Sequence, residues 1–233
     1  PYTPLFRSGD LHALLTATVP TERIHRGKKL VGLTHLDRGA RLDFEDGSVV
    51  EADAVVAADG VHSFIREQMF GREHPTYSGR VAYRTTFPAA LLKAPIDDCT
   101  KWWGKDRHIV IYYTTRAKDE VYFVTSVPES AWTEESWSLK ASTDELRQAF
   151  VGFHPIVTDV LAVCPEVNKW AIFEREPMES WSKGNVVLLG DACHPMTPYM
   201  AQGAATSMED AAVLARCLEG VDAGGVAAAL RIF

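Results

Sequence analysis

The chain has 233 residues, of which 46% are hydrophobic and 24% charged, and its formal net charge is −7 at pH 7. This composition is typical of a soluble globular protein that buries a sizeable core. The acidic balance argues against broad nucleic-acid contact, which needs a basic surface. No run of about 18 apolar residues predicts a membrane span. The four cysteines lack C-x-x-C spacing, which favours free thiols, a cytoplasmic location and no metal site.

The first part of the chain predicts one helix and several short strands. Apolar residues at helical spacing indicate a helix over 8–19. Three β-prone segments follow at 29–36, 40–45 and 48–57. An Asp-Gly pair at 46–47 separates the last two and predicts a hairpin turn.

A second Asp-Gly pair, Asp59-Gly60, has a different context. It follows the apolar run 54–58, which is typical of a buried parallel strand. The next residues, 61–66, do not alternate like a returning strand and indicate the start of a helix. A second hairpin turn is the alternative interpretation.

The middle of the chain is rich in β-prone segments. Such segments occur at 80–87, 99–103, 108–115 and 121–127. They predict a mostly antiparallel sheet that differs from the α/β segments on either side of it. A helix is then expected over 143–153, with acidic residues in its first turn.

The C-terminal part predicts a strand, a loop and a helix between residues 185 and 218. An apolar strand leads to Gly190-Asp191, prolines at 195 and 198 stiffen the loop, and Gly203 opens the helix. A carboxylate fixed at a strand end, followed by a helix N-terminus, suits an elongated polar cofactor.

Together these elements predict an α/β (α+β) fold with an incomplete Rossmann-like, dinucleotide-binding domain. Its two parts are expected at 1–70 and 184–233, on either side of an inserted antiparallel substrate-binding domain at 71–183. No G-x-G-x-x-G fingerprint follows a strand anywhere in the chain. Either the chain binds no dinucleotide, or it is an N-terminally truncated fragment that lacks the opening βαβ unit. We expect the second.

Three motifs carry a family resemblance. Residues 59–66 (DGVHSFIR) fit the pattern D-G-x-x-S-x-x-R, residues 190–195 (GDACHP) fit G-D-A-x-H-P, and residues 7–11 (RSGDL) resemble the R-x-x-L start of a helix that lies along a flavin. In this order and spacing they resemble the flavoprotein aromatic hydroxylases, which are FAD-dependent monooxygenases with the p-hydroxybenzoate hydroxylase fold. The resemblance implies FAD as cofactor and NADH, O2 and a small aromatic molecule as substrates.

The resemblance also implies roles for individual residues. The Asp191 carboxylate is suited to accept hydrogen bonds from the ribityl hydroxyls. Backbone N–H groups at Gly203 and Ala204 are suited to stabilise negative charge on the reduced flavin. The plain alternatives are a loop cap and an ordinary helix start. The implied cofactor-binding residues are Arg7, Asp59, Gly60, Gly190, Asp191, Gly203 and Ala204. Arg66 is expected to pair with Asp59 or phosphate, or to be a solvated charge.

The segments 99–103, 107–112 and 200–203 resemble a branch of this family that acts on hydroxylated aromatic carboxylates. Such enzymes hydroxylate the carboxyl-bearing carbon with loss of carbon dioxide. The leading expected substrate is 6-hydroxynicotinate, giving 2,5-dihydroxypyridine, and salicylate is the alternative. The rivals are a flavin reductase or halogenase on the same fold, and a non-catalytic binding domain. A monomer or homodimer is expected.

His108 and Tyr112 are the expected catalytic residues. Histidine ordinarily titrates near neutral pH, which suits it to activate a substrate hydroxyl. Strand alternation places His108, Val110 and Tyr112 on one face of the sheet. A structural histidine on a strand is the alternative.

The remaining predicted substrate contacts are less direct. By the resemblance, Cys99, Pro195 and Tyr199 are expected to line the substrate site, although the family pattern has a histidine where this chain has Tyr199. Arg80 and Arg84 are suited to bind a carboxylate or to remain solvated charges. Trp102 and Trp103 face opposite sides of their strand, so at most one of them reaches the substrate.

Overall fold

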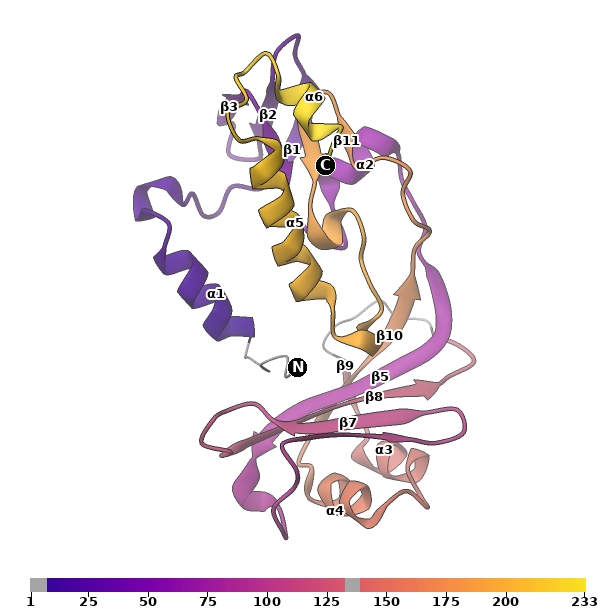
Figure 1. Ribbon diagram of the computed structural model, residues 1–233. Helices are drawn as coiled ribbons and strands as arrows, with labels where there is room; N and C mark the ends of the chain where they lie inside the picture. Colours follow the sequence, from indigo (N-terminus) through magenta and orange to yellow (C-terminus); the bar gives the residue numbers. More distant parts are fainter. Residues whose placement is uncertain (1–7, 133–138) are drawn as a thin grey trace. The chain divides into compact units, whose positions relative to one another are not determined.

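The computed structural model describes residues 8–132 and 139–233 (Figure 1). The chain divides into two compact units. Unit 1 comprises Pro1–Ile24 and Tyr77–Ile172, and unit 2 comprises His25–Thr76 and Phe173–Phe233. This division differs from the predicted one, since the N-terminal helix groups with the middle domain and residues 173–183 with unit 2. In the described ranges no helix has the length and hydropathy needed to cross a membrane.

Unit 2 contains two small sheets and three α-helices. The first sheet is the antiparallel meander β1 (Leu30–His35), β2 (Ala40–Phe44) and β3 (Val49–Ala52). The second has the order β11 (Ser182–Lys183), β12 (Val186–Leu188) and β4 (Val55–Ala57). The helices are α2 (Phe64–Phe70), α5 (Gly203–Cys217) and α6 (Val226–Leu230), and the short 3-10 turns are η3 (Gly190–Ala192) and η4 (Pro198–Met200).

Two sequence predictions in unit 2 meet different outcomes. The Asp-Gly hairpin at 46–47 is confirmed, because Gly47 has φ +80° and its N–H donates to the Phe44 carbonyl oxygen at 2.9 Å. The single β-prone segment 48–57 is wrong as one strand. It is divided between β3 and β4, which belong to different sheets. Valine and alanine recur on both sides of residues 53–54, so the sequence pattern does not show where β3 ends and β4 begins.

Unit 1 is built on a six-stranded sheet of order β6-β7-β8-β5-β10-β9. Its strands are β5 (Thr76–Pro88), β6 (Cys99–Trp103), β7 (His108–Tyr113), β8 (Glu120–Pro128), β9 (Leu139–Ala141) and β10 (Val167–Glu174). The described pairs β5/β8, β6/β7, β7/β8 and β9/β10 are all antiparallel, which confirms the predicted antiparallel sheet. Unit 1 also contains α1 (Ser8–Ala17), η1 (Thr21–Arg23) and η2 (Ala89–Leu91).

Helices α3 (Thr143–Ala149) and α4 (Pro155–Val163) lie on one side of this sheet (Figure 1). They pack on Ile109, Ile111 and Phe123, which are almost fully buried. The helix predicted over 143–153 therefore ends early, and α4 and β10 were not predicted. Pro155 at the first turn starts a separate helix, since proline is favoured there and the His154 ring accepts a hydrogen bond from the Ile156 N–H.

Candidate functional site

The motifs Asp59-Gly60 and Gly190-Asp191 follow two strands that end at the same edge of one sheet. Strands β4 and β12 are hydrogen-bonded in parallel, with Val55 opposite Val186 and Ala57 opposite Leu188. The carboxyl ends of parallel neighbours meet at one edge, so Asp59 and Asp191 both follow that edge. The Asn185 side chain fixes the alignment by donating to the Asp53 carbonyl oxygen at 2.7 Å, across 132 positions of sequence. The predicted parallel strand before Asp59 is thus confirmed.

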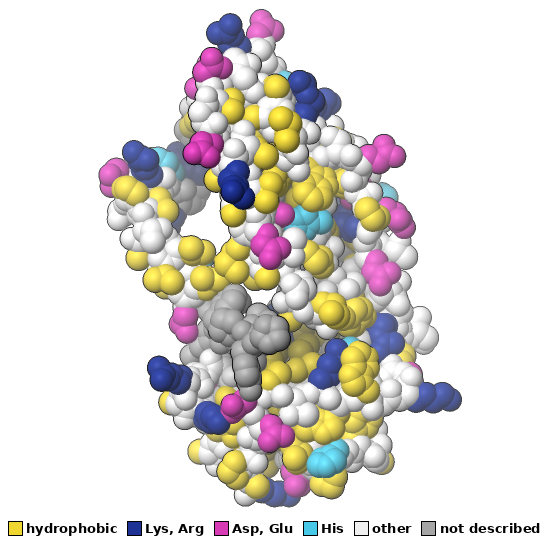
Figure 2. Space-filling model, in the orientation of Figure 1, with side chains coloured by type: hydrophobic (Ala, Val, Ile, Leu, Met, Phe, Trp, Pro, Cys, Tyr) yellow, Lys and Arg dark blue, Asp and Glu magenta, His cyan; other side chains and the backbone are white. Residues whose placement is uncertain are grey.

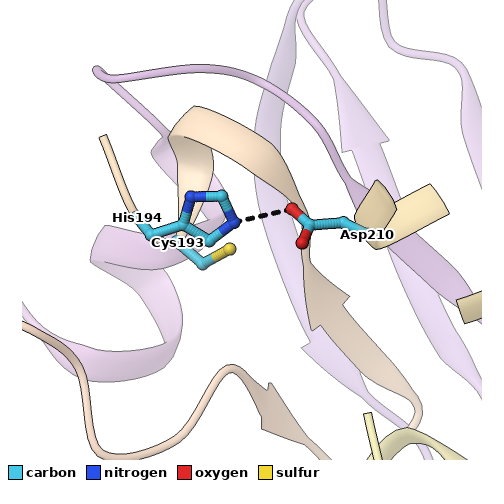
Figure 3. Close-up of side chains that lie close together, drawn as sticks. All are labelled: Cys193, His194 and Asp210. Carbon is cyan, nitrogen blue, oxygen red and sulfur yellow. Dashed lines mark hydrogen bonds and ion pairs between the residues drawn. The ribbon is translucent and has the colours of Figure 1, made fainter. Parts of the chain in front are cut away.

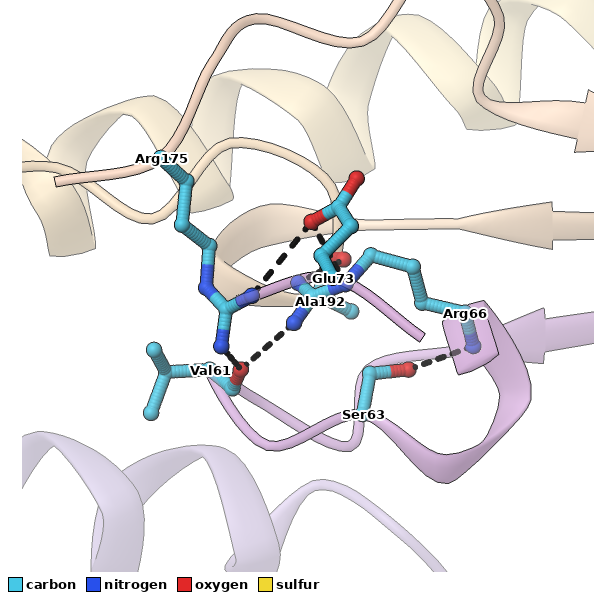
Figure 4. Close-up of polar contacts among 6 residues, drawn as sticks. All are labelled: Val61, Ser63, Arg66, Glu73, Arg175 and Ala192. Carbon is cyan, nitrogen blue, oxygen red and sulfur yellow. Dashed lines mark hydrogen bonds and ion pairs between the residues drawn. The ribbon is translucent and has the colours of Figure 1, made fainter. Parts of the chain in front are cut away.

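Arg66 joins the two loops (Figure 4). It is 5% exposed, and its guanidinium donates to the carbonyl oxygens of Ala192 at 2.8 Å and Val61 at 2.7 Å. Arg175 donates to the same Val61 oxygen at 3.2 Å, and Glu73 lies within 3.7 Å of both guanidinium groups. Arg66 is therefore engaged with backbone carbonyls from both loops, and the alternative of a solvated charge is excluded.

The Asp59 loop ends in a doubly capped helix. Asp59 Oδ2 accepts the Ile65 N–H at 3.2 Å. The Ser63 hydroxyl accepts the Arg66 N–H at 2.9 Å (Figure 4). Both bonds satisfy N–H groups that the first turn of α2 would otherwise leave unpaired. Gly60 has φ +79°, and a β-carbon added there would meet no atom within 4 Å, so open space lies in front of this glycine. The alternative of a second hairpin turn is excluded, because α2 follows.

The turn that begins at Gly190 is held against helix α5 by Asp210, whose contact with His194 is shown in Figure 3. Asp210 Oδ2 accepts the Gly190 N–H at 3.1 Å and lies 2.6 Å from His194 Nε2. Gly190 has φ +62°, and a β-carbon added there would lie 2.6 Å from the Ser207 hydroxyl oxygen. Glycine is therefore required at 190 both by the backbone conformation and by the close approach of α5.

Sequence reasoning missed the contribution of Ser207 and Asp210. The signal was available, since they follow Gly203 at i+4 and i+7 and so share one face of an alanine-rich helix. Their role could not be recognised from the sequence, because it depends on their contact with the Gly190 turn, which precedes the helix.

Cys193, His194 and Asp210 also offer ligand atoms within 4.8 Å of one another (Figure 3). Burial, and then the Asp210 charge, raise the pKa of the Cys193 thiol to about 12. The thiol donates to the Gly190 carbonyl oxygen at 3.2 Å. The Cys193 thiol, His194 Nε2 and the Asp210 carboxylate all take part in hydrogen bonds at this turn, so we interpret the cluster as a hydrogen-bonded support for the turn.

Asp191 presents an acceptor close to the start of α5. Its side chain is exposed, and its Oδ1 lies 3.9 Å from the position that a β-carbon on Gly203 would take. Helix α5 has 15 residues and no side-chain cap at its N-terminus. The strip between Asp191 and Ala204 thus combines a carboxylate with the positive end of a helix, which fits the hydroxyl groups and the electron-rich pyrimidine edge of a flavin.

In unit 1, the sheet face opposite α3 and α4 carries the predicted catalytic residues. We call it the His108 face. Strand pairing arranges it in three cross-strand rows. The rows are Cys99–Tyr112–Tyr122–Thr86, Lys101–Val110–Val124–Arg84 and Trp103–His108–Ser126. Trp102 instead packs against the core on the other face, as alternation predicts.

His108 does not titrate where the sequence argument expected. Its side chain is largely buried, and burial followed by the charges of Lys101 and Arg80 lowers the pKa to about 4. The imidazole is therefore neutral at neutral pH, and the expectation of a group titrating near pH 7 is wrong. A neutral imidazole still accepts a hydrogen bond through one nitrogen and donates through the other.

Tyr112 lies on the same face as His108, and the row that contains Val110 separates the two residues. Burial, then the neighbouring Tyr122 and Cys99, hold the pKa of the Tyr112 hydroxyl well above its ordinary value. The hydroxyl is thus a proton-bearing hydrogen-bond donor. The Tyr112 and Tyr122 rings are 5.0 Å apart between centroids, so they form a continuous aromatic wall.

The two arginines considered as carboxylate binders differ in this structure. Arg80 donates to the Ser126 hydroxyl at 2.6 Å and to the Asp106 carbonyl oxygen at 2.7 Å. Arg84 instead stacks over the Trp170 ring, with its guanidinium carbon 4.1 Å from the ring centroid. Arg80 therefore has a structural role, since its guanidinium is hydrogen-bonded to Ser126 and Asp106.

The other predicted residues are placed as follows. Pro195 and Tyr199 lie in the loop of unit 2 between η3 and α5, and both are half-buried. Cys99 is exposed and begins strand β6. Arg7 lies outside the described residues. On the visible face in Figure 2, basic and acidic side chains are interspersed.

Comparison with known proteins gives a consistent result. A family model described as "FAD binding domain" matches residues 14–230. The chain is 48% identical over 228 residues to a 6-hydroxynicotinate 3-monooxygenase from Bordetella bronchiseptica, covering 97% of this chain and 59% of that protein. It is 46% identical to a 6-hydroxynicotinate 3-monooxygenase from Pseudomonas fluorescens, covering 92% of this chain and 57% of that protein. The chain therefore spans somewhat more than half the length of these relatives.

Solved structures show the same likeness. A salicylate hydroxylase in complex with substrate superposes with a TM-score of 0.84 at 26% identity, covering 96% of this chain and 60% of that one. Klebsiella pneumoniae HpxO, in complex with FAD and uric acid, has a TM-score of 0.80 at 29% identity and covers 96% of this chain and 57% of that one. The family model, which matches most of the chain, establishes that this chain belongs to the FAD-binding domain family.

Proposed function

We propose that the whole protein is a cytoplasmic, FAD-dependent and NADH-using monooxygenase, acting as a monomer or homodimer. Its proposed reaction converts 6-hydroxynicotinate, O2, NADH and two protons to 2,5-dihydroxypyridine, carbon dioxide, water and NAD⁺. The 6-hydroxynicotinate 3-monooxygenases at 48% and 46% identity support this substrate. The observation that carries the flavin part is the convergence of the Asp59 and Asp191 loops at one edge of a parallel strand pair.

Residues of unit 2 would hold the cofactor. Asp191 would accept hydrogen bonds from ribityl hydroxyls, and the N–H groups at Gly203 and Ala204 would face negative charge on the flavin. Gly60 would keep its loop free of a side chain at this edge, and Gly190 allows α5 to approach its turn, while Arg66 and Asp210 hold the loops in place. Bound FAD, once reduced by NADH, supplies the activation and transfer of oxygen.

Residues of the His108 face would orient the substrate. The neutral His108 imidazole would accept a hydrogen bond from the ring hydroxyl of the substrate and so make the ring more electron-rich. Tyr112, which keeps its proton, would donate to an oxygen of the same substrate. Cys99, Pro195 and Tyr199 stay predicted substrate contacts.

The function is tested with the flavin-loaded whole protein. NADH oxidation and O2 consumption are measured with 6-hydroxynicotinate, salicylate or p-hydroxybenzoate, and 2,5-dihydroxypyridine is identified chromatographically. We expect 6-hydroxynicotinate to stimulate both rates and NADH to be preferred over NADPH. Preference for salicylate would favour the second candidate, which the salicylate hydroxylase fold match supports. NADH oxidation that no aromatic compound stimulates would indicate a reductase and contradict the proposal.

The cofactor assignment has a separate test. Asp191→Asn should weaken FAD binding by about 10- to 100-fold, because a charged acceptor to several hydroxyls is lost. The matched control is Glu209→Gln, which removes one negative charge from an exposed position on α5. FAD affinity is read from fluorescence titration of the apoprotein, and equal affinities in the two variants would remove Asp191 from the flavin site.

A further inference from the structure

The His108 face carries one cation at each end of its central row. Lys101 pairs with Val110, Val110 with Val124, and Val124 with Arg84. Strands are spaced about 4.8 Å apart, so the two cations begin about 14 Å apart across a floor of two valines. A flat apolar floor with charged ends fits a planar aromatic anion.

Arg84 is the cation that is preorganised for such an anion. Trp170, which is 6% exposed, provides a fixed platform beneath its guanidinium at 4.1 Å. Arg84 lies near Tyr122, and its charge opposes the rise that burial causes in the pKa of the Tyr122 hydroxyl. A guanidinium stacked on an aromatic ring keeps its in-plane N–H groups available for a bidentate contact with a carboxylate.

The charge around Arg84 favours an incoming anion. In residues 8–132 and 139–233, no aspartate or glutamate forms an ion pair with Arg84. Arg107, by contrast, pairs with Asp106 at 2.7 Å. The three rows of the His108 face contain no acidic residue. An anionic ligand on this face therefore meets positive charge in a protein whose net charge is −7.

Lys101 is less suited to the same task. Its ammonium lies 4.0 Å from the centroid of the Trp103 ring, and that side chain is 71% exposed. An ammonium on a flexible stem gives less directional contacts than a stacked guanidinium.

We infer that Arg84, seated on Trp170 beside Tyr122, binds the carboxylate of the aromatic substrate and makes the enzyme selective for aromatic carboxylates. This inference rests on the proposed function, since it names the group that recognises the acid of that substrate. The aromatic ring of the substrate would then lie over Val110 and Val124, whose row lies between the rows of Tyr112 and His108.

The test compares ligands that differ only in the carboxylate. Dissociation constants of 6-hydroxynicotinate and 2-hydroxypyridine, and of salicylate and phenol, are measured by flavin absorbance titration of the whole protein. Arg84→Gln should weaken binding of each acid by about 10- to 100-fold, and of each carboxylate-free partner by less than about threefold. Arg84→Lys should fall between, because it keeps the charge but loses the bidentate geometry. Lys101→Gln is the matched control, with little expected selective loss.

Three results would overturn the inference. Equal weakening of both members of a ligand pair in Arg84→Gln and Arg84→Lys would mean that Arg84 acts only through packing on Trp170 or Tyr122. A carboxylate-selective loss in Lys101→Gln alone would place the acid at the other end of the row. A wild-type protein that binds acids no better than their carboxylate-free partners would also contradict it. Binding without 6-hydroxynicotinate turnover would instead refute the proposed reaction and leave Arg84 in place.

Discussion

The two units present their candidate functional groups in different ways. In unit 2 the groups lie on loops that follow the carboxyl ends of β4 and β12. These loops depend on hydrogen bonds that Arg66 donates to the Ala192 carbonyl oxygen and that Asp210 accepts from the Gly190 N–H. In unit 1 the groups lie directly on strands of the His108 face, so their spacing follows from sheet register. Loop groups are therefore sensitive to changes in buried supports, whereas strand groups respond mainly to changes in the side chain itself.

The largest effect is expected from the support that joins the two loops of unit 2. Arg66→Leu leaves the buried Ala192 carbonyl without its partner and should lower the free energy of unfolding by about 2–4 kcal/mol. It should also weaken FAD binding, because the Asp59 and Asp191 loops lose their link. Unfolding by urea and FAD titration measure the two effects.

Arg175→Leu is the matched control for Arg66. Arg175 contacts the same Val61 oxygen and Glu73, but no bond joins it to Ala192. Its replacement should cost less than half as much. If both variants lose equal stability, the hydrogen bond from Arg66 to Ala192 does not account for the loss in Arg66→Leu.

A second, smaller effect is the difference in cost between two glycine replacements, which separates close approach from backbone strain. Gly190→Ala meets both a φ of +62° and Ser207, whereas Gly220→Ala meets a φ of +71° with no atom within 4 Å. We expect Gly220→Ala to cost about 1 kcal/mol and Gly190→Ala about 2–4 kcal/mol. Thermal unfolding measures the difference, and equal costs would show that α5 yields to the added methyl group.

The smallest effect concerns His108 and depends on pH. Its pKa of about 4 in the folded protein lies below the ordinary value of 6.5. Between these values the unfolded chain binds more protons than the folded chain, so this group's contribution to stability is complete above pH 6.5 and is lost as the pH falls toward 4. His108→Gln should remove a pH dependence of about 1–3 kcal/mol between pH 7 and 4.

The measurement is urea unfolding of wild type, His108→Gln and the exposed control His25→Gln at several pH values. The stability advantage of wild type over His108→Gln should shrink toward pH 4. The dependence of activity on pH is also compared between wild type and His108→Gln. Any transition that the wild type shows near pH 6.5 should persist when His108 is replaced. A transition that does disappear would show that the imidazole titrates near neutrality after all.

Local sequence determined much of the loop chemistry in unit 2. The apolar runs before Asp59 and Gly190-Asp191, and the glycine that opens α5, predicted a parallel strand, two strand-end carboxylates and a helix N-terminus. These features depend on neighbours within a few residues, so a single sequence reveals them. Alternation likewise placed His108 with Tyr112 and separated Trp102 from Trp103.

Tertiary structure decided everything that depends on long-range contacts. The pairing of β4 with β12, the link from Arg66 to Ala192 and the contact of Asp210 with Gly190 join residues that are far apart or separated by a turn. The neutral state of His108 follows from burial beside Lys101 and Arg80, and the distinction between Arg80 and Arg84 follows from Ser126 and Trp170. A sequence pattern specifies which side chains share a face, but solvation and charge depend on what packs around them.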